Sequence, residues 1–213
     1  MTREAIQSRY RALRAINIAH HSAVLRHLSR AALMKEARSL GLVRGQTLVA
    51  DSEDELTLAF DLAIYTARPG RSRALDRYAR AARLAAGSDE ARVLDAMRAA
   101  RFSIWQIERK HGTAGLMVGD LLRETEGWLM DDGLDANAEV GWAFAMRLCQ
   151  PDAFLMTSGV VVPVDQDVLE EVADQTAGHG FATVAEAADD PRFATALYRV
   201  VVASGVMEAG TSE

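Results

Sequence analysis

The sequence holds a single cysteine, Cys149, among 213 residues. An intrachain disulfide is therefore impossible, and a structural zinc site built from several cysteines is excluded as well. Long apolar runs are also missing, because the longest, residues 159–164 and 200–203, fall far short of the roughly 20 residues that a membrane-spanning helix needs. No basic segment followed by an apolar run and a small-residue cleavage site opens the chain. These absences predict a cytoplasmic protein that does not associate with membranes.

The common signatures of nucleotide-binding proteins and hydrolases are absent too. No glycine-rich loop ends in Gly-Lys-Ser/Thr, which argues against a standard P-loop NTPase. Gly112, Gly115 and Gly119 lie close together, but their spacing differs from the dinucleotide fingerprint and no βαβ pattern surrounds them. Ser158 lacks the flanking glycines of a nucleophile elbow. Cys149 ends an apolar segment, which favours a buried thiol over a nucleophile. We expect no cofactor.

Lysine is scarce, and charge is distributed unevenly along the chain. Only Lys35 and Lys110 occur, so 22 of the 24 basic residues are arginine. Together with the abundant alanine, we interpret this as the codon bias of a GC-rich bacterial genome. Residues 1–110 carry 20 Lys and Arg against 12 Asp and Glu, whereas residues 111–213 carry 4 against 18. The halves are complementary, so mutual packing, within the chain or across a dimer, is favoured over a basic face for an anionic partner.

Helical periodicity dominates residues 1–100. Residues 3–40 contain neither proline nor internal glycine, and they read as one long helix that ends at Gly41. Its stripe consists of Ile6, Leu13, His20, His27 and Met34, with Tyr10, Asn17, Val24 and Ala31 beside it. A lone helix cannot bury such a stripe, so it must pack on other helices or on a second copy of itself. We predict a homodimer formed through this N-terminal helix. Ser52 and Ser88 each predict the cap of a further helix. These helices, expected over about 53–66 and 88–100, and another over 72–86 would complete a bundle of three or four members.

Short strands at close spacing predict a β-module over residues 101–164. The expected strands are 102–109, 116–118, 121–123, 128–131, 140–149 and 154–164. They suggest a small antiparallel sheet or half-barrel. Asp165, Thr183 and Asp190 each precede a helical pattern and predict C-terminal helices over 165–213. The fold class is therefore α+β, either as three regions or as one compact domain.

Loop histidines and nearby carboxylates are the candidate catalytic residues. His111 and His179 both lie in glycine-containing loops, and Asp131 and Asp132 follow one of the expected strands. If these loops converge, the side chains could form an acid–base or metal site, as in a small metal-dependent hydrolase. Solvated turns explain the same residues equally well.

The remaining histidines and the tryptophans have simpler interpretations. His20 and His27 would stand about 10.5 Å apart along one helix, too far to chelate one ion, so no metal site is predicted. Trp105, Trp128 and Trp142 all fall in the β-module. Core packing is their more frequent role, and an aromatic-lined ligand pocket or partner surface is the alternative.

A row of arginines between residues 71 and 83 raises a further alternative, a nucleic-acid-associated protein. Arg73, Arg77 and Arg80 recur at helical spacing and could contact phosphates. No aromatic side chains interleave with them and no recognition motif accompanies them. Such a row is more often a solvated helix face, so we do not expect nucleic acid as a partner.

Residues 102–164 have a recognisable succession of segments. These are Ile104-Trp105-Gln106-Ile107, the turn Gly112-Thr113-Ala114-Gly115, then residues 116–122, 128–131 and 141–148. This succession resembles a small β-module of uncharacterised bacterial proteins, some of which also carry a Cys-rich SEC-C zinc motif. The resemblance implies no established activity and no catalytic residue. The chain lacks the Cys cluster, so neither zinc dependence nor a SecA-related role is implied.

The sequence therefore favours a non-catalytic protein with a binding, regulatory or interaction role. The β-module would bind a small ligand or a protein partner, and the first helix would form the homodimer. The hydrolase that uses His111, His179, Asp131 and Asp132 is the alternative, and the nucleic-acid-associated protein is the second.

Overall fold

The computed structural model of the chain describes residues 1–50, 52–67, 70–176, 186 and 189–205. The chain forms two compact units. The first comprises Met1–Ala23 and Ala81–Val164, and the second comprises Val24–Arg80 and Asp165–Glu213. Helices accompany an antiparallel sheet in each unit, so the predicted α+β class is confirmed. None of the described helices combines the length and the hydropathy that crossing a lipid bilayer requires.

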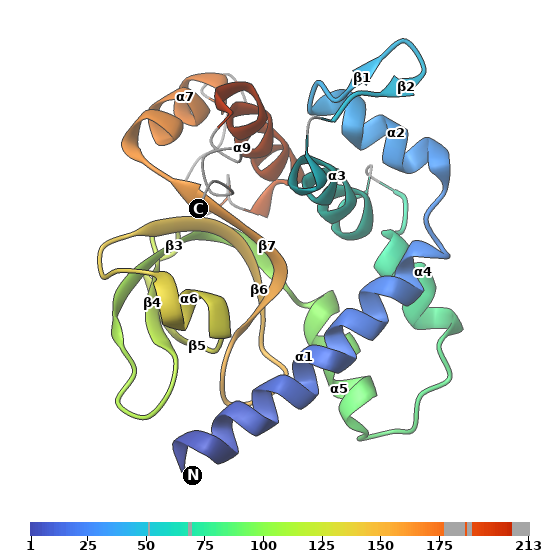
Figure 1. The fold of residues 1–213 in the computed structure, drawn as a ribbon. Coiled ribbons are helices and arrows are strands. Elements are labelled where there is room, and N and C mark those ends of the chain that lie inside the picture. Colours follow the sequence, from blue (N-terminus) through green and yellow to red (C-terminus); the bar gives the residue numbers. More distant parts are fainter. Residues whose placement is uncertain (51, 68–69, 177–185, 187–188, 206–213) are drawn as a thin grey trace. The chain divides into compact units, whose positions relative to one another are not determined.

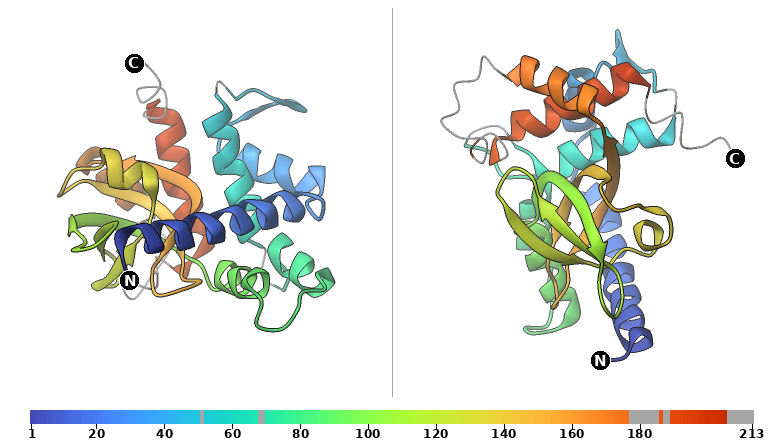
Figure 2. Two further views of the ribbon diagram at one scale, coloured as in Figure 1. Left: turned by 60° about the horizontal axis from the view of Figure 1, so that its bottom comes forward. Right: turned by 90° about the vertical axis from the view of Figure 1, so that its left-hand side faces the viewer.

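The first unit is built on a curved, five-stranded antiparallel sheet with the strand order β5-β4-β3-β6-β7 (Figure 1). Its strands are β3 (Arg101–Lys110), β4 (Leu116–Asp120), β5 (Thr125–Leu129), β6 (Ala143–Cys149) and β7 (Met156–Val164). The two outer strands approach each other at one corner, where the N–H of Leu155 donates to the carbonyl of Trp128 at 2.6 Å and that of Met130 donates to Leu155 at 2.9 Å. Figure 2 shows the curvature from two further directions. The described strands do not close into a complete barrel, so the predicted antiparallel sheet is confirmed in its open form.

One face of the sheet buries a core shared with the short helix α6 (Asp132–Asn137). This core contains Trp105, Ile107, Leu116, Val118, Leu129, Leu134, Ala138, Phe144, Met146 and Leu148. The alternation of side chains along each strand selects these positions, because only every second residue points to a given face. Pro163 lies on the outer strand β7, where its missing N–H interrupts no ladder at the sheet interior.

Helices α1 (Arg3–Leu25) and α5 (Asp89–Arg98) complete the first unit. Five members of the α1 stripe are at most 5% exposed: Ile6, Tyr10, Leu13, Asn17 and His20. The Tyr10 ring meets the edge of Phe154 with centroids 6.3 Å apart. The Nε2 atom of His20 lies 2.9 Å from the carbonyl oxygen of Glu90, on α5. The stripe therefore finds its partners inside the chain, and the predicted homodimer through this helix remains a prediction.

The single helix predicted over residues 3–40 is wrong, because the chain leaves the helical path after Leu25. The N–H groups of His27 and Leu28 donate to the carbonyls three residues earlier, which closes a turn. Ser29 then caps a new helix, α2 (Arg30–Ser39), by accepting a hydrogen bond from the N–H of Ala32 at 3.1 Å. His27 consequently lies in the connecting turn, where its ring meets that of Tyr78 at 5.6 Å.

The second unit contains a two-stranded hairpin and five helices among its described residues. They are α2, β1 (Val43–Arg44), β2 (Thr47–Leu48), α3 (Glu53–Tyr65), α4 (Ala74–Ala81), α7 (Gln166–Thr176) and α9 (Pro191–Ser204). Helix α9 lies beside α7 and α3, and α3 in turn lies beside α2 (Figure 1). The phenol of Tyr198 donates to Asp61 at 3.2 Å, which joins α9 to α3 by a buried polar contact.

The predicted helix starts at Ser52, Ser88, Asp165 and Asp190 are confirmed. Each side chain accepts a hydrogen bond from an N–H in the first turn, for example the N–H of Val168 on Asp165 at 2.9 Å. The start predicted at Thr183 lies outside the described residues.

Three other local predictions are wrong. The helix expected over 72–86 spans only Ala74–Ala81, because residues 81–87 bury no side chain fully and helices of this length depend on packing. Residues 121–123 form a turn and no strand, since the carboxylate of Asp120 accepts the N–H groups of Leu122 and Arg123. The strand expected over 128–131 ends at Leu129, and Asp131 instead caps α6.

Candidate functional site

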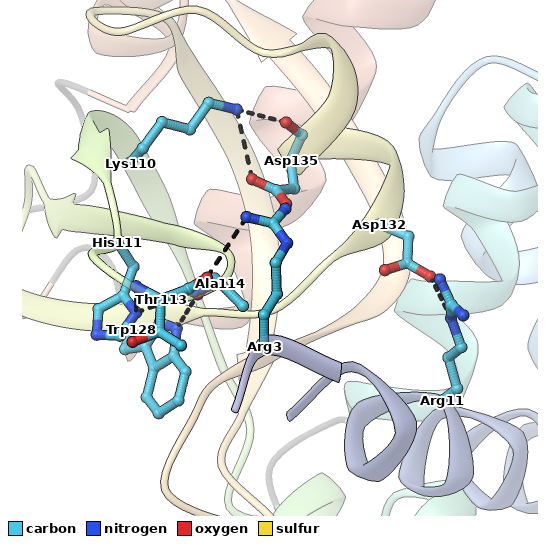
Figure 3. Close-up of polar contacts among 9 residues, drawn as sticks. All are labelled: Arg3, Arg11, Lys110, His111, Thr113, Ala114, Trp128, Asp132 and Asp135. Carbon is cyan, nitrogen blue, oxygen red and sulfur yellow. Dashed lines mark hydrogen bonds and ion pairs between the residues drawn. The ribbon is translucent and has the colours of Figure 1, made fainter. Parts of the chain in front are cut away.

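The structure brings two of the sequence-derived candidates together, His111 and Trp128. Their rings stack with centroids 4.3 Å apart and planes inclined by 20° (Figure 3). The indole N–H of Trp128 donates to the carbonyl of Ala114 at 2.7 Å. The Nδ1 atom of His111 accepts the N–H groups of Thr113 at 3.3 Å and Ala114 at 3.4 Å. The stack therefore shapes the turn between β3 and β4.

Charged side chains surround this turn. Arg3, at the start of α1, reaches the carbonyl of Thr113 at 3.4 Å and the carboxylate of Asp135 at 3.0 Å. Lys110 contacts the same Asp135 from the other side, through both its carboxylate and its backbone carbonyl (Figure 3). The side chains of Arg3 and Lys110 are largely exposed, so each ion pair with Asp135 contributes little to stability on its own. They connect α1 and α6 to the stack.

The two candidate aspartates serve other partners. One oxygen of Asp131 accepts the N–H groups of Gly133 and Leu134, both at 3.1 Å, and the other accepts the hydroxyl of Thr157 at 2.9 Å. Asp132 pairs with Arg11 of α1 at 2.9 Å. Within the described residues neither carboxylate hydrogen-bonds to His111.

The fourth candidate for the hydrolase site, His179, lies outside the described residues. In the part of the chain that is described, no three His, Cys, Asp or Glu side chains gather so that they could hold a metal ion. The convergence that the hydrolase hypothesis requires therefore remains a prediction.

The other two tryptophans occupy different environments. Trp105 lies in the core of the sheet opposite Phe144, and its indole nitrogen has no hydrogen-bond partner among the described residues. Trp142 lies just before β6 with 48% of its surface exposed, and its ring is tilted against Phe144 at 6.3 Å. In the part of the chain that the structure describes, the three indoles do not line one common pocket.

Two members of the arginine row bind to the protein itself. Arg73 forms a two-point ion pair with Asp76, and Arg77 donates to the carbonyls of Ser72 at 2.6 Å and His27 at 3.0 Å. Arg80 is exposed on α4. The row thus contributes to the local structure of α4 and its neighbouring turns.

The Cys149 thiol is buried at the end of β6. Its exposed fraction is 3%, and burial raises the pKa of the thiol to about 12. A thiol that stays protonated is a poor nucleophile, which agrees with the interpretation from sequence.

A cavity of about 600 Å³ lies in the second unit, among α2, the end of α3 and the first half of α9. Sequence reasoning did not anticipate it. Its lining consists of Lys35, Glu36, Ser39, Thr66, Ala67, Asp190, Pro191, Arg192, Thr195, Ala196 and Arg199. This volume falls within the range of about 300–1,000 Å³ that is common for small-molecule sites.

Charged side chains of both signs line the cavity. Arg192 binds Asp190 through two hydrogen bonds, at 2.9 and 2.7 Å, and this contact raises the pKa of the guanidinium. Lys35 pairs with Glu36, whose residue is only 8% exposed. With Arg199, the lining holds three cations against two carboxylates. The available signal in the sequence was the spacing of Arg192 and Arg199, which also fits a solvated helix face.

The chain is similar to a described family along most of its length. A family model with the description "Family of unknown function (DUF7986)" matches residues 4–203. No curated protein matches the chain significantly, and neither does any solved structure.

Proposed function

The chain belongs to the family of unknown function DUF7986, and from that premise we propose that it is a non-catalytic binding protein whose small ligand occupies the cavity of the second unit. The cavity is the observation that carries the proposal. It has the volume of a small-molecule site, and its walls hold the few charged and hydroxyl groups that orient a ligand in such sites. A regulatory role would follow from ligand binding on α9.

The contacts of the candidate catalytic residues support a binding role over hydrolysis. Asp131 caps α6, Asp132 pairs with Arg11, and His111 uses Nδ1 to hold its own turn. A general base needs access to the proton that it removes, and these three groups already have structural partners.

Ligand-detected NMR with a fixed panel of small molecules tests the proposal. The panel comprises butyrate, glutarate, 3-phosphoglycerate, butyramide and putrescine. We expect at least one of them to bind the wild-type protein and to lose binding in Thr195→Trp, because the indole would fill the cavity from its partly exposed wall. The control is Thr57→Trp, at an exposed position on α3 outside the cavity. If no panel member binds, or if Thr195→Trp binds as the wild type does, the proposal is wrong.

A second candidate function, interaction with another copy of the chain, is favoured by the outer face of α1. Ile18 and Leu25 lie seven residues apart on that face and are 54% and 42% exposed. Ser22 lies between them in the sequence, Ala15 lies one turn before Ile18, and both are exposed as well. An apolar line of this spacing can pair with a second helix. The dimer would then use a face of α1 that the buried stripe leaves exposed.

The arginine-rich and alanine-rich composition supports a bacterial source and a cytoplasmic location. The succession of segments in residues 102–164 supports a distant relation to SEC-C-associated proteins. Fractionation of the native host, followed by detection of the protein with an antibody, tests the location. Recovery in a membrane or extracellular fraction would contradict it.

A further inference from the structure

We infer that the ligand of the second-unit cavity is a small dianion, a molecule whose two anionic groups are separated by a short carbon chain. The inference rests on the proposed function and adds the chemical class of the ligand. It follows from the placement of the cations in the cavity.

One face of α9 forms a wall of the cavity. Arg192, Thr195, Ala196 and Arg199 stand at positions i, i+3, i+4 and i+7, which share one face of a helix. Two arginines therefore flank a stretch of small side chains. Seven residues of helix rise about 10.5 Å. Both side chains leave the helix toward its N-terminus, so when they extend alike their guanidinium groups stand about that distance apart.

This spacing selects the length of the ligand. A charge-assisted hydrogen bond between guanidinium and carboxylate takes about 2.8 Å at each end. About 5 Å then remains between the two anionic groups. A chain of about three carbon atoms covers that gap, as in a five-carbon dicarboxylate or a three-carbon phosphocarboxylate. A single carboxylate could engage only one of the two arginines.

The opposite wall adds a third cation. Lys35 and Ser39 lie one turn apart on α2, and Lys35 is 44% exposed on its side chain. The carboxylates of Glu36 and Asp190 are each bound to a neighbouring cation, Lys35 and Arg192 respectively. The Arg192–Asp190 pair is exposed on its cationic side, where ion pairs are worth little, so sharing Arg192 with a ligand costs little. Glu36 is buried, so Lys35 stays bound to it and contributes to the ligand only the donors that this pair leaves over.

The lining hydroxyls favour a polar group in the middle of the ligand. Ser39 and Thr66 each donate to a helix carbonyl at 2.7 Å, and Thr195 donates to the carbonyl of Pro191 at 3.3 Å. Their protons are used, so each oxygen offers only its acceptor capacity. A hydroxyl or amino substituent on the carbon chain could donate to one of them.

Isothermal titration calorimetry at low ionic strength tests the inference, with glutarate, butyrate, butyramide and 3-phosphoglycerate as probes. We expect glutarate to bind at least about tenfold more tightly than butyrate, because butyrate forgoes one charged contact. Arg192→Gln and Arg199→Gln should each weaken glutarate to the level of butyrate. Arg80→Gln, an exposed arginine of the same unit outside the cavity, should leave it unchanged. Circular dichroism confirms that each variant folds.

The outcomes separate this inference from the proposed function. Equal affinity for glutarate and butyrate would overturn the dianion. Binding of butyramide alone, blocked by Thr195→Trp, would also overturn it while the binding function stands. If no probe binds, both the dianion inference and the proposed binding function are wrong. Tighter binding of 3-phosphoglycerate than of glutarate would support a dianion and identify phosphate as one of its ends.

Discussion

The imidazole of His111 lies flat against the indole of Trp128, with ring centroids 4.3 Å apart. Trp128 in turn meets Phe154 edge-on at 5.7 Å, and Phe154 meets Tyr10 of α1 at 6.3 Å. Four rings thus run from the turn between β3 and β4 to α1. This run ties the hairpin to α1, so its members are expected to stabilise the first unit.

Replacing Trp128 tests this role. Trp128→Phe keeps a ring but removes the N–H that donates to Ala114, and we expect it to lower the free energy of unfolding by about 1–3 kcal/mol. His111→Ala should lower it by about 0.5–1.5 kcal/mol through loss of the stack. Urea unfolding followed by circular dichroism measures both. Trp142→Phe, at a half-exposed indole, is the control and should change stability by less than about 0.5 kcal/mol. Equal losses in all three variants would contradict a special role for the stack.

Gly115, which closes the same turn, should tolerate no side chain. Its φ is +78°, and an added Cβ would clash with the backbone carbonyl of Leu129. We expect Gly115→Ala to cost at least about 1–2 kcal/mol from the left-handed backbone alone. In Gly119→Ala the new Cβ would meet only the flexible end of Glu108, so the loss should be clearly smaller. Thermal unfolding of the two variants compares them, and a reversed order would show that the Gly115 backbone relaxes.

Local signals in the sequence predicted the local features of the fold. Ser52, Ser88, Asp165 and Asp190 cap helices as expected, because a cap depends only on the next three residues. The break at Ser29 was missed because the seven-residue pattern continues across it without glycine or proline. Its cap lacks the glutamate that would complete a capping box.

The candidate sites depended on contacts that no local pattern contains. His111 and Trp128 are 17 positions apart in the chain, and they meet only because β4 pairs with both β3 and β5. The cavity joins Lys35 to Arg199 across more than 150 residues. Arg192 and Arg199 were visible as a spacing, but the same spacing fits any exposed helix face. Only tertiary packing distinguishes a helix face that lines a cavity from one that faces solvent.

Acid should remove the stabilisation that Arg9 provides. Hydrogen bonds from Arg9 hold the pKa values of Asp89 and Asp152 below their ordinary value of 3.8. As the pH falls, the two carboxylates are protonated in the unfolded chain near pH 3.8 and in the folded protein only at lower pH. The stabilisation that they provide is therefore present above pH 3.8 and disappears as the pH falls through their folded-state pKa values. We expect Arg9→Gln to be less stable than the wild type at pH 7, with a gap that narrows below pH 3.8. Urea unfolding across pH 2.5–7 measures it.

Arg98→Gln is the matched control for this prediction. Arg98 pairs with Asp95 on the same helix, where both side chains are largely exposed. Such a pair contributes little at any pH. If Arg98→Gln loses as much stability at pH 7 as Arg9→Gln, the loss reflects general removal of positive charge and not the Asp89 and Asp152 contacts.

The thiol of Cys149 should react only when the first unit opens. It is 3% exposed, and burial raises its pKa to about 12. We therefore expect a chromogenic disulfide reagent at pH 8 to label the native protein at least about a hundredfold more slowly than the urea-unfolded chain, whose thiol has an ordinary pKa near 8.5. Stopped-flow absorbance records both rates. Rapid labelling without denaturant would show that the end of β6 is accessible.

If the predicted homodimer forms through α1, the exposed face that carries Ile18 and Leu25 should form its interface. Ile18 and Leu25 are the exposed large apolar side chains of that face, whereas the stripe on the other face is buried in the chain. We expect native mass spectrometry at micromolar concentration to show a dimer that Ile18→Ser with Leu25→Ser converts to monomer. Leu121→Ser is the control, because Leu121 is similarly exposed, at 45%, in a turn of the sheet. A monomeric wild type would refute the dimer. A dimer that survives the double substitution would place the interface elsewhere, since an apolar helix seam loses its burial when both of its large side chains become polar.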